Sequence, residues 1–318
     1  MKHHLTLLGL CALTALVACA PANTPQSTPV ASPIQATALS PLNSPLSPAD
    51  PLAQLDLVYH SLQGGARHIF RRQPGRPPRQ LTLNGLNNTE ARWSPDGRQI
   101  AYTANMAEGR YELYVMNADG SDQRRLLKQD LAYNWGASWS PDGTQILFAS
   151  NHSGFSQLYV VGLDGENPRQ ITFEGNNFLG AWSPDGRRIA FTSDRGGQGD
   201  NEIYVMNADG SQVEQLTDNA IDDAAPAWSP DGRYLAFHSY EQGVFNIYVY
   251  DLERRQSQAV TREALPVRFP AWSPDGRYIL ATQQPGEREF DGLVIAFPEG
   301  QVVQRLPGAE EMRARPTS

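Results

Sequence analysis

The stretch Trp-Ser-Pro-Asp-Gly at residues 93–97 recurs four times, and its spacing decides the fold. The later copies occupy residues 139–143, 182–186, 228–232 and 272–276. A second landmark, an aliphatic residue usually followed by threonine, stands at Leu81, Leu126, Ile171, Leu216, Val260 and, in a weaker form, Leu306. These landmarks are separated by 45, 45, 45, 44 and 46 residues. A period of about 45 residues with a Trp-Asp-type signature is typical of four-stranded propeller blades.

Each repeat contains four short strand-like segments. In the repeat around Trp228 the predicted strands are Ala225–Ser229, Tyr234–His238, Asn246–Tyr250 and Gln258–Thr261. These segments are rich in β-branched and aromatic residues and are separated by turn-forming residues. Because no segment shows sustained helical periodicity, the sequence predicts an all-β domain of four-stranded antiparallel blades.

The repeated pentapeptide is interpreted as scaffold. Its proline presets φ at the second turn position, its serine and aspartate can accept backbone hydrogen bonds, and its glycine accepts a left-handed conformation. It therefore predicts a hairpin turn between the innermost strand of a blade and the next strand. The preceding tryptophan offers a large flat surface for packing against the neighbouring blade. This role is assigned to Trp93, Trp139, Trp182, Trp228 and Trp272.

The repeat from Trp182 to Thr217 carries a family resemblance. Its sequence, WSPDGRRIAFTSDRGGQGDNEIYVMNADGSQVEQLT, resembles the repeat of the TolB-type β-propellers. The resemblance covers about residues 55–306 and implies six blades, provided that Leu55–Thr82 is counted as a repeat that lacks its tryptophan strand. Related propellers also cap hydrolases of the prolyl-oligopeptidase type, but this sequence has no G-x-S-x-G nucleophile motif.

A C-terminal strand could complete the first blade. Pro316 follows Leu306 by the same ten residues that separate Pro226 from Leu216. We therefore expect the C-terminal residues to supply the missing inner strand, with Pro316 in the position of Pro226. Such a closure would remove an exposed sheet edge.

The N-terminal residues predict export and lipidation. Lys2 precedes the apolar run Leu5–Val17, which is shorter than the roughly 20 residues of a membrane-spanning helix and suits a secretory signal. The residues that follow resemble a bacterial lipobox, which implies a lipid on Cys19. The alternative is an ordinary cleaved signal.

The residues after Cys19 predict a tether. Between Ala20 and Leu52 there are eight prolines and a single charge, a composition that does not fold by itself. We expect a signal peptide at 1–18, a lipid-bearing tether at 19–52 and a propeller at 53–318. The propeller would then be anchored to the bacterial cell envelope on its periplasmic or extracellular face.

Charge and cysteine content restrict the partners. Without the signal peptide the chain has 25 basic and 34 acidic residues and a net charge of −9, which argues against nucleic acid as a partner. Cys11 leaves with the signal and Cys19 carries the lipid, so neither is free for a disulfide or a zinc site. We expect a monomer.

The two faces of the predicted propeller differ in sequence. The Trp-Ser-Pro-Asp-Gly turns and the turns at Asn117–Gly120 and Asn207–Gly210 are uniform and lie on one face. Loops on the other face differ from repeat to repeat, as at 105–111, 151–157 and 193–201. Uniform turns on one face and individual loops on the other are typical of a binding scaffold. We therefore expect the site at the channel mouth on the variable face.

Polar and aromatic residues recur at that mouth. Asn88, Asn134, Asn177 and Asp223 each stand five residues before a repeat tryptophan, and Glu90 and Asp222 lie beside them. They could line a ligand site or bind a divalent cation such as calcium, but they could equally cap the turns entering the inner strands. No metal-specific spacing is present. The aromatic candidates for partner contact, or for filling the mouth, include Trp135, Phe178 and Phe269.

Two functions remain open from the sequence. The first is a membrane-tethered envelope module that binds a protein or peptide on its variable face and needs no cofactor. The second is a carbohydrate-active or metal-dependent hydrolase or lyase, with Glu90, Trp135, Asp222 and Asp223 as the residues to test.

Overall fold

The computed structural model describes residues 51, 54–106, 109–129, 133–197, 199–286 and 289–316. The predicted signal peptide, Cys19 and, apart from Pro51, the predicted tether lie outside the described residues. Within these ranges no helix combines the length and the apolar character required to cross a membrane.

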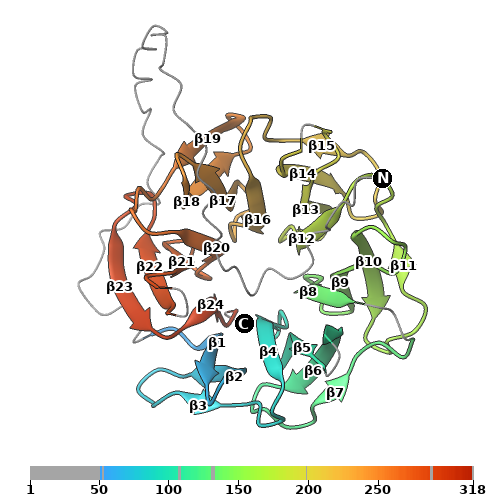
Figure 1. Cartoon of the computed structure of the whole chain (residues 1–318), viewed down its shortest axis with the longest axis vertical. Helices are drawn as coiled ribbons and strands as arrows, with labels where there is room; N and C mark the ends of the chain where they lie inside the picture. The colour runs from blue at the N-terminus through green and yellow to red at the C-terminus, as the bar shows by residue number, and fades with distance from the viewer. Residues whose placement is uncertain are drawn as a thin grey trace, which may run out of the picture. The chain divides into compact units, whose positions relative to one another are not determined.

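The described strands form six antiparallel sheets of four strands each, which are arranged around a central axis as the blades of a propeller (Figure 1). Blade 1 consists of β24 (Glu310–Ala314), β1 (Leu57–Gln63), β2 (Ala66–Arg72) and β3 (Arg79–Gln80). Blade 2 consists of β4 (Asn87–Trp93), β5 (Gln99–Asn105), β6 (Tyr111–Asn117) and β7 (Arg124–Arg125), and blade 3 of β8 (Asn134–Trp139), β9 (Gln145–Ser150), β10 (Gln157–Gly162) and β11 (Arg169–Gln170).

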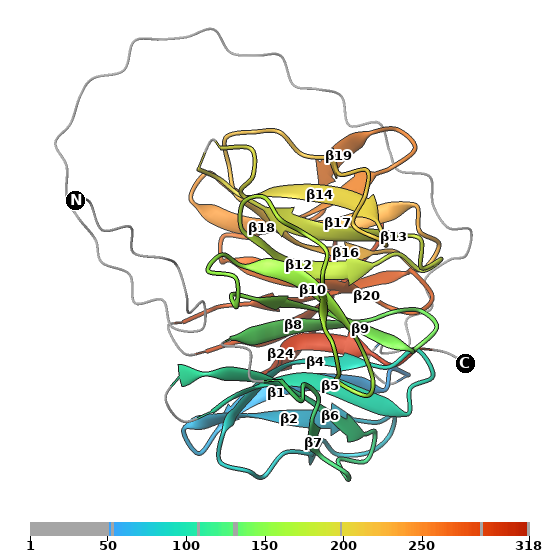
Figure 2. The same ribbon diagram turned by 90° about the vertical axis from the view of Figure 1, so that its right-hand side faces the viewer.

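The remaining three blades repeat this order. Blade 4 consists of β12 (Asn177–Trp182), β13 (Arg188–Ser193), β14 (Glu202–Asn207) and β15 (Glu214–Gln215), and blade 5 of β16 (Asp223–Trp228), β17 (Tyr234–Glu241), β18 (Val244–Asp251) and β19 (Gln256–Ala259). Blade 6 consists of β20 (Val267–Trp272), β21 (Tyr278–Gln283), β22 (Asp291–Ala296) and β23 (Val302–Pro307). The inner strands β4, β8, β12, β16, β20 and β24 surround the axis in Figure 1, and the third strand of blade 3, β10, faces the viewer in the side view (Figure 2). The predicted six-bladed, all-β fold is confirmed.

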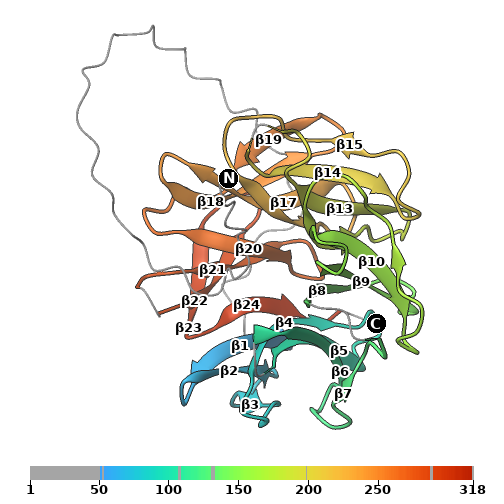
Figure 3. The ribbon, with the colours of Figure 1, turned by 45° about the vertical axis from the view of Figure 1, so that its right-hand side comes forward.

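The C-terminal strand β24 completes blade 1, as expected. It pairs antiparallel with β1, with Ala314 opposite Leu57, and Figure 3 shows it in red beside the blue strand. The predicted register is wrong. Because Ala314 takes the place that a tryptophan has in the other inner strands, Met312 rather than Pro316 corresponds to Pro226.

The Trp-Ser-Pro-Asp-Gly turns share one hydrogen-bond pattern. In blade 2 the Ser94 hydroxyl donates to Asp96 Oδ1 at 2.6 Å and accepts the backbone N–H of Gln99 at 2.9 Å. Gly97 has φ of +65° and donates its N–H to the Ser94 carbonyl oxygen. The left-handed φ explains why glycine ends the motif.

The repeat tryptophans join neighbouring blades. The indole N–H of Trp228 donates to the carbonyl oxygen of Ala181, on the inner strand of the preceding blade, at 3.1 Å. Trp93, Trp139 and Trp272 make the equivalent bond at 3.0–3.2 Å. Trp182 differs, because its Nε1 is buried without a partner among the described residues.

This difference predicts unequal effects of tryptophan substitution. Trp228→Phe should cost about 1 kcal/mol more unfolding free energy than Trp182→Phe, because only the first removes an indole hydrogen bond and leaves the Ala181 carbonyl without that donor. Urea unfolding of both variants measures the difference. Equal losses would show that the indole bond does not hold blades 4 and 5 together.

Candidate binding face

The loops at one end of the propeller are defined by strand order. In each blade the inner strand begins, and the fourth strand ends, at the same end of the disc. We call this end the mouth face; it carries the loops between second and third strands and the connections from each fourth strand to the next inner strand. The opposite end, which carries the Trp-Ser-Pro-Asp-Gly turns, is called the turn face.

The four residues five positions before the tryptophans are buried. Asn88, Asn134 and Asn177 have no exposed surface, and Asp223 is 1% exposed. Asn88 Nδ2 donates to the Leu86 carbonyl oxygen, and Asn177 Nδ2 donates to the Glu174 carbonyl oxygen, both at 2.8 Å. Hydrogen bonds of this kind cap the connection that enters an inner strand.

Asp223 takes part in a buried acidic pair with Glu202. Asp223 Oδ2 accepts from Asn219 Nδ2 at 2.8 Å, while Glu202 accepts from the Thr217 hydroxyl and from the Asn219 backbone N–H. Burial raises the pKa of Asp223 and raises the pKa of Glu202 to about 7. Each carboxylate therefore costs stability when it is ionised inside the blade.

The raised pKa of Glu202 predicts a pH-dependent stability. A folded-state pKa of about 7, above the ordinary 4.5, means that stability is full below about pH 4.5 and is lost as the pH rises through 7. Glu202→Gln should therefore raise the melting temperature at pH 8 and have little effect at pH 5. In blade 3 the position of Glu202 is occupied by Gln157, whose Oε1 accepts the Thr172 hydroxyl as Glu202 accepts that of Thr217.

Thermal melts of Glu202→Gln from pH 5 to 8 test this expectation, with the exposed Glu174→Gln as the control. A gain that is the same at pH 5 and pH 8 would contradict it.

Asp222 ties blade 5 to blade 4. Its Oδ1 accepts both the backbone N–H and the side-chain Nδ2 of Asn201, at 3.0 and 2.8 Å. Asn87 accepts the backbone N–H of Arg67 in the same way between blades 2 and 1. These residues hold the loops of the mouth face in place.

Glu90 belongs to a charged cluster that the sequence analysis did not assemble. Its Oε2 accepts from the Thr103 hydroxyl at 2.7 Å and from the Gly136 backbone N–H at 2.9 Å. Burial and the nearby Glu311 raise the pKa of Glu90. Arg92 lies 3.5 Å from Glu311, and burial together with repulsion from Arg92 lowers the pKa of Arg313 to about 9.

These four charges come from only two neighbouring inner strands, β4 and β24. Glu90 and Glu311 both have positive φ, 56° and 48°, three residues before the end of the strand. The corresponding positions of the other inner strands are uncharged, as are those next to their tryptophans: Gly136, Ser138, Leu179, Ala181, Ala225, Ala227, Phe269 and Ala271. At these two positions the charged residues are thus confined to β4 and β24, and the other inner strands carry small or apolar residues.

The catalytic alternative named Glu90, Trp135, Asp222 and Asp223 as the residues to test, and burial raises the pKa of two of its carboxyl groups, Glu90 and Asp223. The residues that shift the pKa of Glu90 belong to blades 1 to 3, whereas those that shift the pKa of Asp223 belong to blades 4 and 5 and their connection. The structure therefore places these two carboxyl groups in separate environments. Among the described residues there is no group of three or more His, Cys, Asp or Glu side chains that could hold a metal ion.

The predicted aromatic residues divide into packed and exposed groups. Trp135 and Phe178 pack with Trp182 against the buried residues between blades 3 and 4. Phe269 lies edge-on to His238 with ring centroids 5.3 Å apart. Phe155, at 65% exposure, projects from the β9–β10 loop.

Exposed large apolar side chains gather on the mouth face. In the described part of the chain eight such residues are exposed, and six of them lie in mouth-face loops or at the ends of the strands that enter them. These six are Leu62, Leu83, Phe155, Phe173, Tyr240 and Leu265. The apolar exposure of the described part of the chain is therefore concentrated at one end of the propeller, and contiguous apolar patches are typical of interaction surfaces.

Four of these residues, Leu62, Leu83, Phe173 and Leu265, were missed in the sequence. Leu83, Phe173 and Leu265 lie in the connections from a fourth strand to the next inner strand, and the first two are 80% and 76% exposed. For Leu83 and Phe173 the available signal was an apolar residue directly after the Leu-Thr or Ile-Thr landmark, where the strand has already ended.

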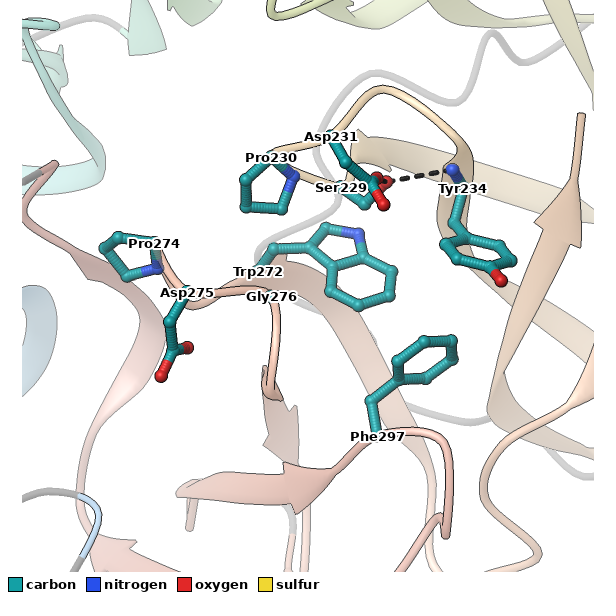
Figure 4. A pocket seen from close by; sticks show the side chains of 9 residues that line it. All are labelled: Ser229, Pro230, Asp231, Tyr234, Trp272, Pro274, Asp275, Gly276 and Phe297. Carbon is teal, nitrogen blue, oxygen red and sulfur yellow. Dashed lines mark hydrogen bonds between the residues drawn. The ribbon is translucent and has the colours of Figure 1, made fainter. Parts of the chain in front are cut away.

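The turn face has a small hollow between blades 5 and 6. Trp272, Tyr234 and Phe297 form its floor (Figure 4), with Trp272 and Phe297 edge to face at 4.8 Å. Its volume of about 90 Å³ is below the roughly 300–1,000 Å³ of small-molecule pockets. We therefore assign this hollow to packing between blades.

The arrangement is that of a six-bladed β-propeller whose mouth face carries individual loops and exposed apolar side chains. The chain belongs to the TolB beta propeller domain family, which matches residues 84–181 and 172–297.

Solved structures agree on the fold. TolB from Acinetobacter baumannii superposes with a TM-score of 0.72 and 21% identity over 83% of this chain and 67% of that one. A putative TolB from Agrobacterium tumefaciens superposes with a TM-score of 0.67 and 19% identity over 83% of this chain and 99% of that one. A chain of a nidogen–laminin complex superposes with a TM-score of 0.67 and 10% identity over 82% of this chain and 98% of that one. At these identities the comparison concerns the fold, because one fold serves many functions.

Proposed function

We propose that this protein is a binding module of the bacterial cell envelope that captures a polypeptide partner on its mouth face. The observation that carries the proposal is the concentration of exposed apolar side chains there: Phe155 and Phe173 are exposed by 65% and 76%. Aromatic side chains are enriched at the centres of protein interfaces and contribute much of their binding energy.

The rigid blades suit such a partner. Asp222 and Asn87 fix the loops of the mouth face to neighbouring blades, so little conformational entropy is lost on binding. An interface of about 800 Å² per partner is the standard size for a specific complex.

The proposal includes a lipid anchor at Cys19 and a tether up to about residue 52. About 33 residues of proline-rich chain would span roughly 30–100 Å, and the anchor would raise the effective concentration of partners at the membrane. Cys19→Ala is expected to abolish labelling by a radioactive fatty acid and to move the protein from the membrane fraction to the soluble fraction. Unchanged labelling and fractionation would contradict the anchor.

Capture from crosslinked envelopes tests the binding module. The tagged full-length chain should retain a specific protein that is lost with Phe155→Ser/Phe173→Ser. The control is Val213→Ser/Val303→Ser, which removes two side chains that are each 41% exposed away from the mouth face. Equal capture by both double variants would contradict binding at the mouth face.

A further inference from the structure

Arg268 occupies an apolar cluster at the mouth face. It lies on β20, opposite Thr282 of β21, and its guanidinium carbon is 4.0 Å from the ring centroid of Phe245. Phe245 belongs to the β17–β18 hairpin of blade 5, where the centroid of the Tyr240 ring lies 4.7 Å from that of Phe245. The His238 ring lies edge-on to the Phe245 ring, with the centroids 5.2 Å apart. Tyr240 itself is 41% exposed.

No acidic group compensates this arginine within the described residues. Arg268 makes no ion pair there, and its Nε is buried without a hydrogen-bond acceptor. Two other partly buried arginines have carboxylate partners: Arg71 pairs with Asp56 at 2.5 Å and Arg233 with Asp251 at 3.2 Å. Arg268 is partly buried, and removing an unpaired cation from water is unfavourable.

The neighbouring groups cannot replace a carboxylate. His238 Nδ1 accepts the backbone N–H of Phe269 at 3.3 Å, and burial together with Arg268 lowers the pKa of His238 to about 3. His238 is therefore a neutral ring that shapes the cluster. The contact with Phe245 offsets only part of the desolvation of Arg268.

The cluster is also held rigidly. Phe269 has φ of +56°, a conformation that a bulky residue adopts only when its surroundings enforce it. It lies edge-on to His238, which in turn contacts Phe245. The arginine is thus surrounded by fixed rings before any ligand arrives.

We propose that Arg268, framed by Phe245, Tyr240 and Phe269, is a receptor for a carboxylate of the bound polypeptide, next to an apolar side chain of that polypeptide. The inference rests on the proposed function for the source of its ligand. One guanidinium matches one carboxylate with two parallel hydrogen bonds, and the apolar rings suit a monoanion beside a hydrophobic group. The carboxylate could be an acidic side chain or a chain terminus, and the experiment separates the two.

Peptide titration followed by the Nε–H signals of arginine in the ¹⁵N-labelled full chain tests the proposal. The side-chain probe is acetyl-Phe-Asp-amide, with acetyl-Phe-Asn-amide as its neutral match. The terminal probe is acetyl-Ala-Phe with a free carboxyl group, with its amide as the match. The Arg268 signal is assigned by its loss in Arg268→Lys. At least one acidic probe should shift this signal and should have a dissociation constant at least about tenfold lower than that of its neutral match.

Matched variants separate binding from structure. Arg268→Gln should abolish the preference for the acidic probe, whereas Arg195→Gln should keep it. Arg195 also stacks on aromatic rings, at 5.0 Å from Phe191, but its Nη2 already donates to Asn177 Oδ1. Arg268→Met should fold with an unchanged or higher melting temperature, because it removes an uncompensated cation.

Three results would overturn the carboxylate receptor: equal binding of acidic and neutral probes, binding of inorganic phosphate but of neither carboxylate, or a marked fall in melting temperature in Arg268→Met. If the probes fail while envelope capture still depends on Phe155 and Phe173, only this inference falls. Probe binding without such capture would instead overturn the proposed function and leave a carboxylate site.

Discussion

A chain cut after Gly308 is expected to lose most of its stability, because blade 1 then lacks its inner strand. The deleted segment includes Ala309 and Met312, both fully buried between blades 1 and 6, and it exposes the edge of β1. A single substitution tests the same contact. Met312→Asp should lower the free energy of unfolding by about 4–5 kcal/mol, because it buries an unpaired carboxylate among apolar residues.

Val303→Asp is the control for this substitution. Val303 lies on the outer strand β23 and is 41% exposed, so its replacement should change stability by no more than about 0.5 kcal/mol. Thermal and urea unfolding measure both variants, and size-exclusion chromatography detects association through the open edge of the truncated chain. A truncated chain that unfolds at the temperature of the intact protein would refute the closure of the ring by β24.

The second large effect is expected at Gly165, where the absence of a side chain allows two neighbouring blades to approach closely. A Cβ atom there would lie 1.8 Å from the backbone carbonyl oxygen of Leu126, and Gly165 has φ of +72°. The turn between the third and fourth strands of blade 3 thus packs on the fourth strand of blade 2. Gly210 and Gly300 make the same approach to Ile171 and Val260.

Gly165→Ala should therefore destabilise the protein by about 4 kcal/mol or more, because a backbone atom cannot move aside. Gly85→Ala is the matched control, because Gly85 has a similar φ of +70° but no atom lies within 4 Å of a Cβ added there. That variant should cost only the 1–2 kcal/mol of a left-handed alanine. If urea unfolding gives the same loss for both, the close approach between blades 2 and 3 is not a constraint.

The period of the repeat was sufficient to predict the number of blades and the order of their strands. Each tryptophan and each Ser-Pro-Asp-Gly turn marks one strand end, so local chemistry and spacing agree. The positive φ at Glu90 and Phe269 was not predictable, because neither residue type favours that conformation. It coincides with the shift in register between each of these inner strands and the second strand of its blade.

The register of β24 shows where spacing fails. Leu306 does take the place of Leu216, because Leu293 pairs with Arg305 as Tyr204 pairs with Gln215. The connection that follows turns at Gly308 with φ of +75° and is four residues shorter than the one that leads into blade 5. This shorter connection shifts the strand by four residues. Without a tryptophan to align, the sequence offered no means of detecting the shift.

The candidate site was only partly predictable. Polar residues before the tryptophans were easy to find, but burial is a property of the folded loops, and Asn88 and Asn177 are fully enclosed. Arg268 attracted no notice because an arginine in a strand usually has a partner. Its significance depends on Phe245 and Tyr240, which come from the neighbouring blade.

The measurement that tests the central claim most directly is site-specific photocrosslinking of the full-length protein in intact envelopes. A photoreactive phenylalanine analogue is placed at Tyr240 on the mouth face or, in a separate variant, at the exposed Pro230 on the turn face. The account predicts a discrete crosslinked polypeptide from position 240 and none from position 230. Crosslinking from position 230 alone, or equally from both positions, would contradict a binding module that acts through its mouth face.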